Sequence, residues 1–135
     1  MATTDETESL VGVLRGTMLA LVRREGSDLS ARQLAVCLTC YLESEAQTVR
    51  GLAATLDVSK PAITRALDRL AEFDLVRRKT DPADRRSVLV QRTPKGTAFL
   101  RDLRAIMKEA AKPKPVAAEP APRKKAAAKS ARTTR

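Results

Sequence analysis

The sequence contains no histidine and no tryptophan, and its aromatic residues are limited to Tyr41, Phe73 and Phe99. Without histidine the chain lacks the usual general base and the commonest zinc ligand. Acidic residues are scattered and no glycine-rich phosphate loop occurs, so the sequence indicates neither an enzyme nor a metal or cofactor site. The scarcity of aromatic residues also argues against single-strand binding, which needs stacking platforms.

Long hydrophobic runs are missing as well. The longest mainly apolar stretch, residues 10–22, is interrupted by Arg15 and is shorter than the roughly 20 residues that cross a bilayer. The first residues are acidic (Asp5, Glu6 and Glu8), which argues against a secretion signal. With two cysteines and no export signal, a reducing compartment is indicated. We therefore expect a cytoplasmic protein without a membrane partner.

The charge that is present is mostly positive, with 26 Lys and Arg against 16 Asp and Glu and a net charge of +10. Residues 112–135 hold eight cations and one acid, a net +7 of that total. This stretch is rich in Pro, Ala and Lys and has no periodic apolar residues, so we expect a disordered tail. This excess of positive charge indicates a polyanionic partner, and nucleic acid is favoured over a membrane surface. We favour DNA contact by the tail, including Lys124 and Lys125, over a solubilising role alone.

Residues 48–70 have the pattern of two helices joined by a tight turn. Thr48 and Ser59 are candidate N-caps, because their hydroxyls can accept a bond from a first-turn N–H group. Pro61 fits the first turn of the second helix, where no intrahelical N–H is needed. In a helix-turn-helix the second helix enters the major groove, with its N-terminal residues nearest the bases. The DNA-binding residues predicted here are Thr48, Ser59, Lys60, Pro61, Thr64, Arg65 and Arg69.

Two runs rich in β-branched residues follow, residues 75–80 and 87–92, joined by a turn-rich loop over 81–86. A hairpin directly after a recognition helix is a wing. An arginine at its tip can enter a narrow minor groove, where negative potential is concentrated. The predicted DNA-binding residues of this hairpin are Arg77, Arg78, Lys79, Asp84, Arg85, Arg86 and Arg92.

The chain from about residue 48 to 100 resembles the winged helix of the MarR family of bacterial regulators. The motifs that carry the resemblance are Ser59-Lys60-Pro61, Thr64-Arg65, Asp84-Arg85-Arg86 and Thr93-Pro94-Lys95-Gly96. The resemblance implies that the helix starting near Ser59 reads the major groove. It also implies that Arg86, with Arg85 as a further candidate, reaches the minor groove, and that Asp84 holds the wing arginines in place.

The resemblance also implies partners. The family usually works as a homodimer on a pseudo-palindromic operator, often with a small effector between the dimer helices and the winged helix. We therefore expect double-stranded DNA and a second copy of the chain as partners, and the effector is unknown.

Two helices are predicted before the motif, one over residues 8–24 and one that begins at a capping box formed by Ser30 and Gln33. Gly12 and Gly16 lie four apart on the first helix. Each is unfavourable in a helix interior. This spacing indicates either close approach of another helix, a symmetric partner's among the candidates, or relaxed packing within the monomer.

The second helix carries Cys37 and Cys40 in a C-x-x-C spacing. A redox pair normally lies at a helix N-terminus, where the dipole lowers a thiol pKa, whereas these cysteines fall well inside the helix. We therefore favour buried apolar residues over a thiol sensor, although some family members sense oxidants through cysteine.

Thr93 and Pro94 open a last helix as N-cap and first residue. Relatives usually carry a longer C-terminal helical region that builds the dimer, so a smaller or differently built dimer is expected here. Arg92 stands where the family usually has leucine. It either weakens the apolar anchor below the wing or adds a phosphate contact.

The sequence therefore predicts a mainly α protein with a small β-hairpin wing (α+β), a winged helix-turn-helix. Its predicted parts are the N-terminal dimer or support helices (1–47), the winged helix-turn-helix (48–93), a C-terminal helix (94–111) and the basic tail (112–135). The predicted function is that of a MarR-like transcriptional regulator in the nucleoid, with the tail adding non-specific DNA affinity. The alternatives are an architectural DNA-binding protein with little sequence specificity, and a redox sensor built on Cys37 and Cys40.

Overall fold

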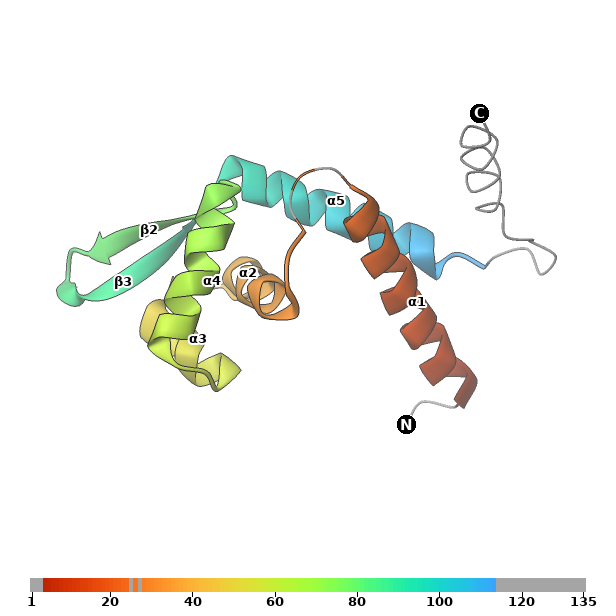
Figure 1. The fold of residues 1–135 in the computed structure, drawn as a ribbon, viewed down its shortest axis with the longest axis horizontal. Helices are drawn as coiled ribbons and strands as arrows, with labels where there is room; N and C mark the ends of the chain where they lie inside the picture. Colours follow the sequence, from red (N-terminus) through yellow and green to blue (C-terminus); the bar gives the residue numbers. More distant parts are fainter. Residues whose placement is uncertain (1–3, 25, 27, 114–135) are drawn as a thin grey trace, which may run out of the picture.

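The computed structural model describes residues 4–24, 26 and 28–113. In chain order the elements are α1 (Thr4–Arg23), α2 (Ala31–Leu42), β1 (Gln47–Thr48), α3 (Val49–Leu56), α4 (Lys60–Glu72), β2 (Val76–Asp81), β3 (Asp84–Arg92) and α5 (Pro94–Ala111). Figure 1 shows the β2–β3 hairpin projecting from one end of the molecule and α1 lying against α5 at the other. The predicted winged helix-turn-helix is confirmed. The basic tail from residue 114 on, with Lys124 and Lys125, lies outside the described residues.

Side-chain caps set the start of four helices, as their sequences predicted. Ser30 and Gln33 form the capping box of α2, with reciprocal bonds of 3.1 and 2.9 Å between side chain and backbone. The hydroxyl oxygens of Thr48, Ser59 and Thr93 accept the N–H groups that start α3, α4 and α5. The first helix starts at Thr4, earlier than predicted, and its first turn contains Asp5 and Glu6, which favour the positive end of the helix dipole.

The wing is a tighter hairpin than predicted. The strands β2 and β3 are antiparallel in register Val76↔Arg92 to Thr80↔Val88; after a register shift Asp81 pairs with Asp84, so only Pro82 and Ala83 remain as the turn. The predicted loop over 81–86 is therefore mostly strand, because the pair Asp81↔Asp84 extends β3 back to Asp84, with residues 85–87 in an irregularity of the ladder. A short strand, β1, was not predicted from sequence. It pairs with β3 on the other side, which gives the sheet order β1-β3-β2.

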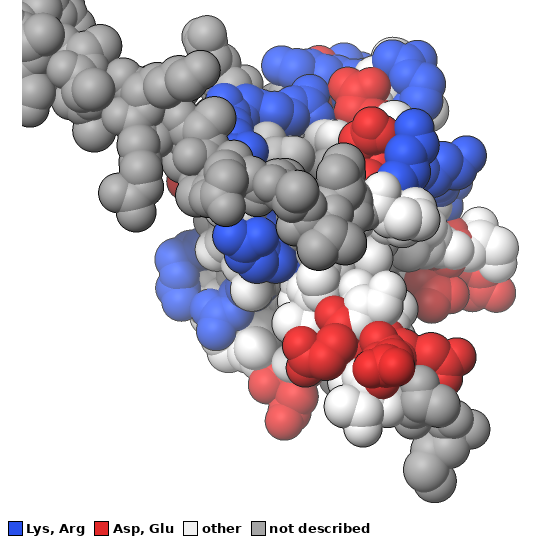
Figure 2. Space-filling model, turned by 90° about the vertical axis from the view of Figure 1, so that its right-hand side faces the viewer, with Lys and Arg blue, Asp and Glu red and all other residues white. Residues whose placement is uncertain are grey.

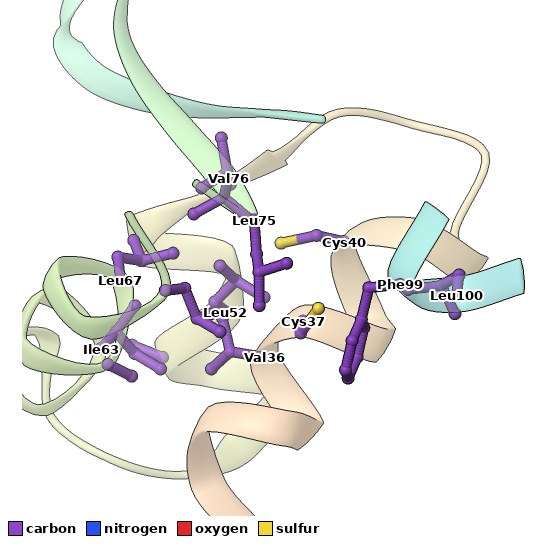
Figure 3. Close-up of a cluster of buried hydrophobic side chains, with 14 of the residues drawn as sticks. Val36, Cys37, Cys40, Leu52, Ile63, Leu67, Leu75, Val76, Phe99 and Leu100 are labelled. Carbon is purple, nitrogen blue, oxygen red and sulfur yellow. The ribbon is translucent and has the colours of Figure 1, made fainter. Parts of the chain in front are cut away.

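The core lies where α2, α3, α4 and the first part of α5 meet the base of the sheet (Figure 3). Its fully buried side chains include Val36 of α2, Leu52 of α3, and Ile63 and Leu67 of α4. Phe99 and Leu100 bring α5 into the same cluster. This packing fixes the buried side of α4, so the opposite side of that helix is held outward.

A hydrogen-bonded junction around Tyr41 joins α2, the wing and α5. The Tyr41 hydroxyl donates to the Leu75 carbonyl at 2.6 Å and accepts the Thr93 N–H at 3.0 Å. The Thr93 hydroxyl donates to the Asp74 carbonyl at 2.6 Å and accepts the Gly96 N–H at 2.9 Å. A Cβ atom at Gly96 would collide with the Tyr41 hydroxyl and the Leu75 carbonyl, so this position requires glycine.

At the other end of the molecule α1 packs on α5. Gly16 lies so close to α5 that an added Cβ would be only 2.9 Å from that of Ala110. The structure therefore explains Gly16, one of the two glycines of the first helix, by the close approach of α5 within the same chain. Gly12, in contrast, has open space where its Cβ would be. Arg24 also bonds Asp102 of α5 at 3.3 Å.

Candidate nucleic-acid interface

The exposed side of α4 carries the polar residues expected of a recognition helix. Ser59 and Pro61 lie at its start, and Lys60 and Arg65 point outward. Neither Lys60 nor Arg65 has an ion pair within the described chain, so both charges are available to a partner. Ala62 and Ile63 are buried on the other side. The helix therefore presents cations and hydroxyls along a face whose orientation the core fixes.

One hollow of about 230 Å³ lies between the start of α4, the start of α3 and the part of β3 nearest the turn of the wing. Its lining brings together residues from β1, α3, α4 and β3, with α4 and β3 distant in sequence from the rest. They are Thr48, Val49, Arg50, Lys60, Thr64, Arg86, Ser87 and Val88. Four of the predicted DNA-binding residues (Thr48, Lys60, Thr64 and Arg86) therefore converge here. Arg50 was not predicted, and its exposed first-turn position in α3 was the only signal available.

A second, more open hollow lies between α4 and the start of α2. It is lined by Ser30, Ala31, Arg32, Gln33, Ala62, Arg65 and Ala66. Arg65 was predicted, whereas Arg32 was missed because nothing in the sequence relates α2 to the helix-turn-helix. At 3.6 residues per turn, the α4 positions that line the two hollows fall on opposite sides of the helix. The hollows therefore flank the exposed face.

Aspartates hold the tip of the wing. Asp81 accepts the Ala83 N–H at 2.9 Å, and Asp84 accepts the Arg86 N–H at 3.1 Å and the Ser87 hydroxyl at 3.2 Å. Asp84 thus shapes the backbone that carries Arg86 and forms no ion pair with the arginine side chains around it. Lys79, Arg85 and Arg86 are exposed and have no ion pair among the described residues.

Three predicted site arginines are held by carboxylates of the same chain. Arg78 of β2 bonds Asp68 of α4 at 2.6 Å, which ties the wing to the recognition helix. Arg69 bonds Glu72 at 2.9 Å, and Arg77 lies 3.6 Å from Asp74. These pairs are substantially exposed, so each contributes at most about 1 kcal/mol to stability. Of the three pairs, Arg78–Asp68 joins the wing to α4, and the other two join residues three apart in the chain.

Arg92 contacts the end of α2, unlike the other predicted DNA-binding residues of the wing. Its Nε donates to the Cys40 carbonyl at 2.9 Å and its terminal nitrogen donates to the Glu43 carbonyl at 2.5 Å. Its guanidinium also lies over the Tyr41 ring, 5.7 Å from the centroid. Arg92 therefore satisfies carbonyls at the C-terminal end of α2, where a cation suits the helix dipole.

Cys37 and Cys40 are free thiols buried in the core (Figure 3). The pKa of Cys37 is raised to about 12, mainly by burial and in smaller part by the neighbouring Cys40. Burial also raises the pKa of Cys40 to about 11, against an opposing effect of Arg92. Because the thiolate is the reactive form, these surroundings disfavour attack on an oxidant.

The residues that the structure describes provide neither a metal site nor a helix able to span a membrane. They contain no group of three or more His, Cys, Asp or Glu side chains placed to hold a metal ion. Among the helices over residues 4–24, 26 and 28–113, none has the length and apolar character needed to cross a membrane.

The fold and this surface define a winged helix-turn-helix, and comparison with known proteins gives the family. The MarR family model matches residues 29–88. The transcriptional regulator BldR from Sulfolobus solfataricus is 30% identical, with 81% of each chain covered and a TM-score of 0.55. The transcriptional regulator Tm0710 from Thermotoga maritima is 22% identical, with 76% of this chain and 70% of that chain covered and a TM-score of 0.66.

A third solved structure is that of an S. aureus MepR–DNA complex. It is 17% identical, with 76% of this chain and 79% of that chain covered and a TM-score of 0.60. A search of curated proteins finds no match to this chain. The chain belongs to the MarR family, and its fold is that of the family's transcriptional regulators.

Proposed function

We propose that this protein is a transcriptional regulator that binds a specific site on double-stranded DNA. The observation that carries the proposal is the outward face of α4, where unpaired cations lie next to a hollow shared with the wing. MepR, which is similar in fold, was solved in complex with DNA, and that supports the same class of partner for this chain.

In the proposed complex α4 enters the major groove. Its first residues, Ser59, Lys60 and Pro61, lie closest to the bases, followed by Thr64 and Arg65 one turn later. Arg65 is the residue best suited to read a base, because its guanidinium can donate two hydrogen bonds to a guanine edge. Its exposure and lack of an ion pair support this role.

The wing supplies the minor-groove contact. Arg85 and Arg86 follow the turn, and Lys79 of β2 pairs with Leu89 farther along β3, so three exposed cations lie on the hairpin. A narrow minor groove attracts such cations through its concentrated negative potential. Arg69, Arg77 and Arg78 act mainly through their ion pairs, of which Arg78–Asp68 joins the wing to α4.

The protein is proposed to act as a homodimer through α1 and α5. Leu10, Leu14 and Val22 of α1 are 65, 60 and 59% exposed, and Met107 of α5 is 43% exposed. This end of the molecule carries acidic side chains where α1 begins and Lys and Arg side chains in its upper part (Figure 2). A symmetric pair would cover the apolar residues and bring unlike charges together. Such a dimer would present two copies of α4 to the two halves of a pseudo-palindromic site.

The basic segment beyond residue 113 is proposed to add affinity that does not depend on sequence. Each phosphate neutralised contributes about 0.9 to the slope of log affinity against log salt. Removing residues 112–135 is therefore expected to flatten that slope on any duplex, and an unchanged slope would exclude DNA contact by this segment.

Selection from a random duplex pool, followed by sequencing of bound DNA, tests the function. We expect one enriched motif with two related halves. Arg65→Ala should then lower affinity for the selected duplex by about 1–3 kcal/mol more than for a scrambled duplex. Arg104→Ala is a control for DNA contact, because Arg104 is exposed on α5 rather than on α4 or the wing; sedimentation is used to verify that the variant keeps the proposed α1–α5 dimer. No enriched motif, or equal losses on both duplexes, would instead favour an architectural protein with little sequence preference.

A further inference from the structure

We propose that Arg32 and Arg50 each hold one backbone phosphate of DNA, on the two strands that border the groove entered by α4. The proposal rests on the DNA binding proposed above and adds two residues outside the recognition helix α4 and the wing, Arg50 on the first helix of the helix-turn-helix and Arg32 on α2. Both belong to helices whose other role is to support the core.

The surroundings of the two arginines are alike. Arg32 lies in the first turn of α2 and Arg50 in the first turn of α3, and both side chains are exposed. Neither has an ion pair within the described chain. Neither first turn contains an acidic residue, whereas α1 begins with Asp5 and Glu6. The charge of each arginine is therefore added to the positive end of a helix dipole without local neutralisation.

Each arginine shares a hollow with a different side of the recognition helix. Arg50 lines the hollow that also contains Lys60 and Arg86. Arg32 lines the hollow that also contains Arg65. The two hollows therefore concentrate positive charge on both flanks of α4, while its outermost residues lie between them.

The dimensions of duplex DNA explain why one phosphate contact on each side of α4 would be useful. The major groove is about 12 Å wide, close to the diameter of a helix with its side chains. A helix inserted in it consequently has one phosphate row on each side. Cations carried by α2 and α3 would contact those rows and fix the depth and tilt of α4 without reading sequence.

The test measures affinity against salt for Arg32→Gln, Arg50→Gln and the double variant, by fluorescence anisotropy on full-length protein. Both a selected duplex and a scrambled duplex are used. Each single substitution should flatten the slope of log affinity against log salt by about 0.9 per bound protomer, equally on both duplexes. The double variant should show the sum. Arg104→Gln, the control, should leave the slope unchanged.

Substitution by lysine separates charge from side-chain shape. Arg32→Lys and Arg50→Lys should retain the slope, because each lysine can still neutralise a phosphate. The unfolding temperature should be unchanged in the lysine variants and unchanged or slightly raised in the glutamine variants, since no ion pair is lost and glutamine removes a cation from the positive end of a helix dipole.

The outcomes separate this inference from the proposed function. If the slopes of log affinity against log salt are unchanged in a protein that still selects its motif, the phosphate contacts of Arg32 and Arg50 are overturned while the proposed function stands. A loss confined to the selected duplex would also overturn them, because it would assign the arginines to base reading. If the slopes flatten as expected on both duplexes but no motif is enriched, the phosphate contacts of the two arginines are supported and the proposed sequence-specific function fails.

Discussion

The Tyr41 junction predicts a large effect from the loss of one oxygen atom. Tyr41→Phe keeps the ring in place and removes only the hydroxyl. That hydroxyl donates to the Leu75 carbonyl and accepts the Thr93 N–H. Leu75 and Thr93 are each 2% exposed, so both backbone groups would lose their partner in a nearly dry site.

The magnitude follows from those two groups. An unsatisfied buried donor or acceptor costs about 1–3 kcal/mol. Tyr41 itself is only partly buried, and water reaching the vacated position would reduce the cost. We therefore expect the free energy of unfolding to fall by about 2–3 kcal/mol, with little change in apolar burial.

Urea unfolding at one fixed protein concentration measures this effect, because the proposed dimer would make the apparent stability depend on concentration. With an m-value of about 1–3 kcal/mol/M for a small protein, a loss of about 2–3 kcal/mol should lower the urea midpoint by about 0.7–3 M. Thr39→Val is a matched control. It removes a hydroxyl that bonds the Ala35 carbonyl at 2.8 Å within α2, and no buried group depends on that bond.

The reasoning would be refuted by a loss below about 0.5 kcal/mol for Tyr41→Phe. Such a result would mean that the Leu75 and Thr93 groups find other partners. A comparable loss for the Thr39→Val control would also refute it, since hydroxyl removal would then be costly without orphaned backbone groups.

Three further predictions concern the dimer, the wing and the thiols. Leu14→Glu should weaken self-association at least about 100-fold in sedimentation experiments, since burial of a leucine contributes about 1.5–3 kcal/mol on each subunit; an unchanged dimer would place the interface elsewhere. Asp68→Asn should lower the free energy of unfolding by no more than about 1 kcal/mol, because its ion pair with Arg78 is largely exposed, and a larger loss in urea unfolding would contradict that estimate. Burial raises the pKa of Cys37 to about 12 and that of Cys40 to about 11, from a usual 9.0. The contribution of the two buried, protonated thiols to the free energy of unfolding is therefore complete below about pH 9 and is lost as the pH rises through 11–12. Native thiolate absorbance should therefore stay low at pH 9–10, and rapid reaction of either thiol with a disulfide reagent near neutral pH would contradict the burial.

Helix starts were predictable because they depend on residues close together in sequence. Ser30 with Gln33, and Thr48, Ser59 and Thr93 with the turns they cap, need only the local chain to form their bonds. Apolar spacing likewise identified the buried side of α4, and hence the outward position of Arg65. The wing was recognised from its charge and turn residues, but its length was not, because the start of β3 depends on pairing with β2.

The sequence by itself therefore determined the order of the helices and of the two wing strands, the caps of four helices and the face of α4 that remains exposed, since these follow from hydrogen bonds and periodicity within a few residues. Only the tertiary structure decided where distant residues meet. Arg92 is engaged by carbonyls of α2 about fifty residues earlier in the chain, with bonds at Cys40 and Glu43. Arg32 and Arg50 flank α4 because the core packs α2 and α3 beside it. Such meetings depend on the packing of whole helices, which no local pattern encodes.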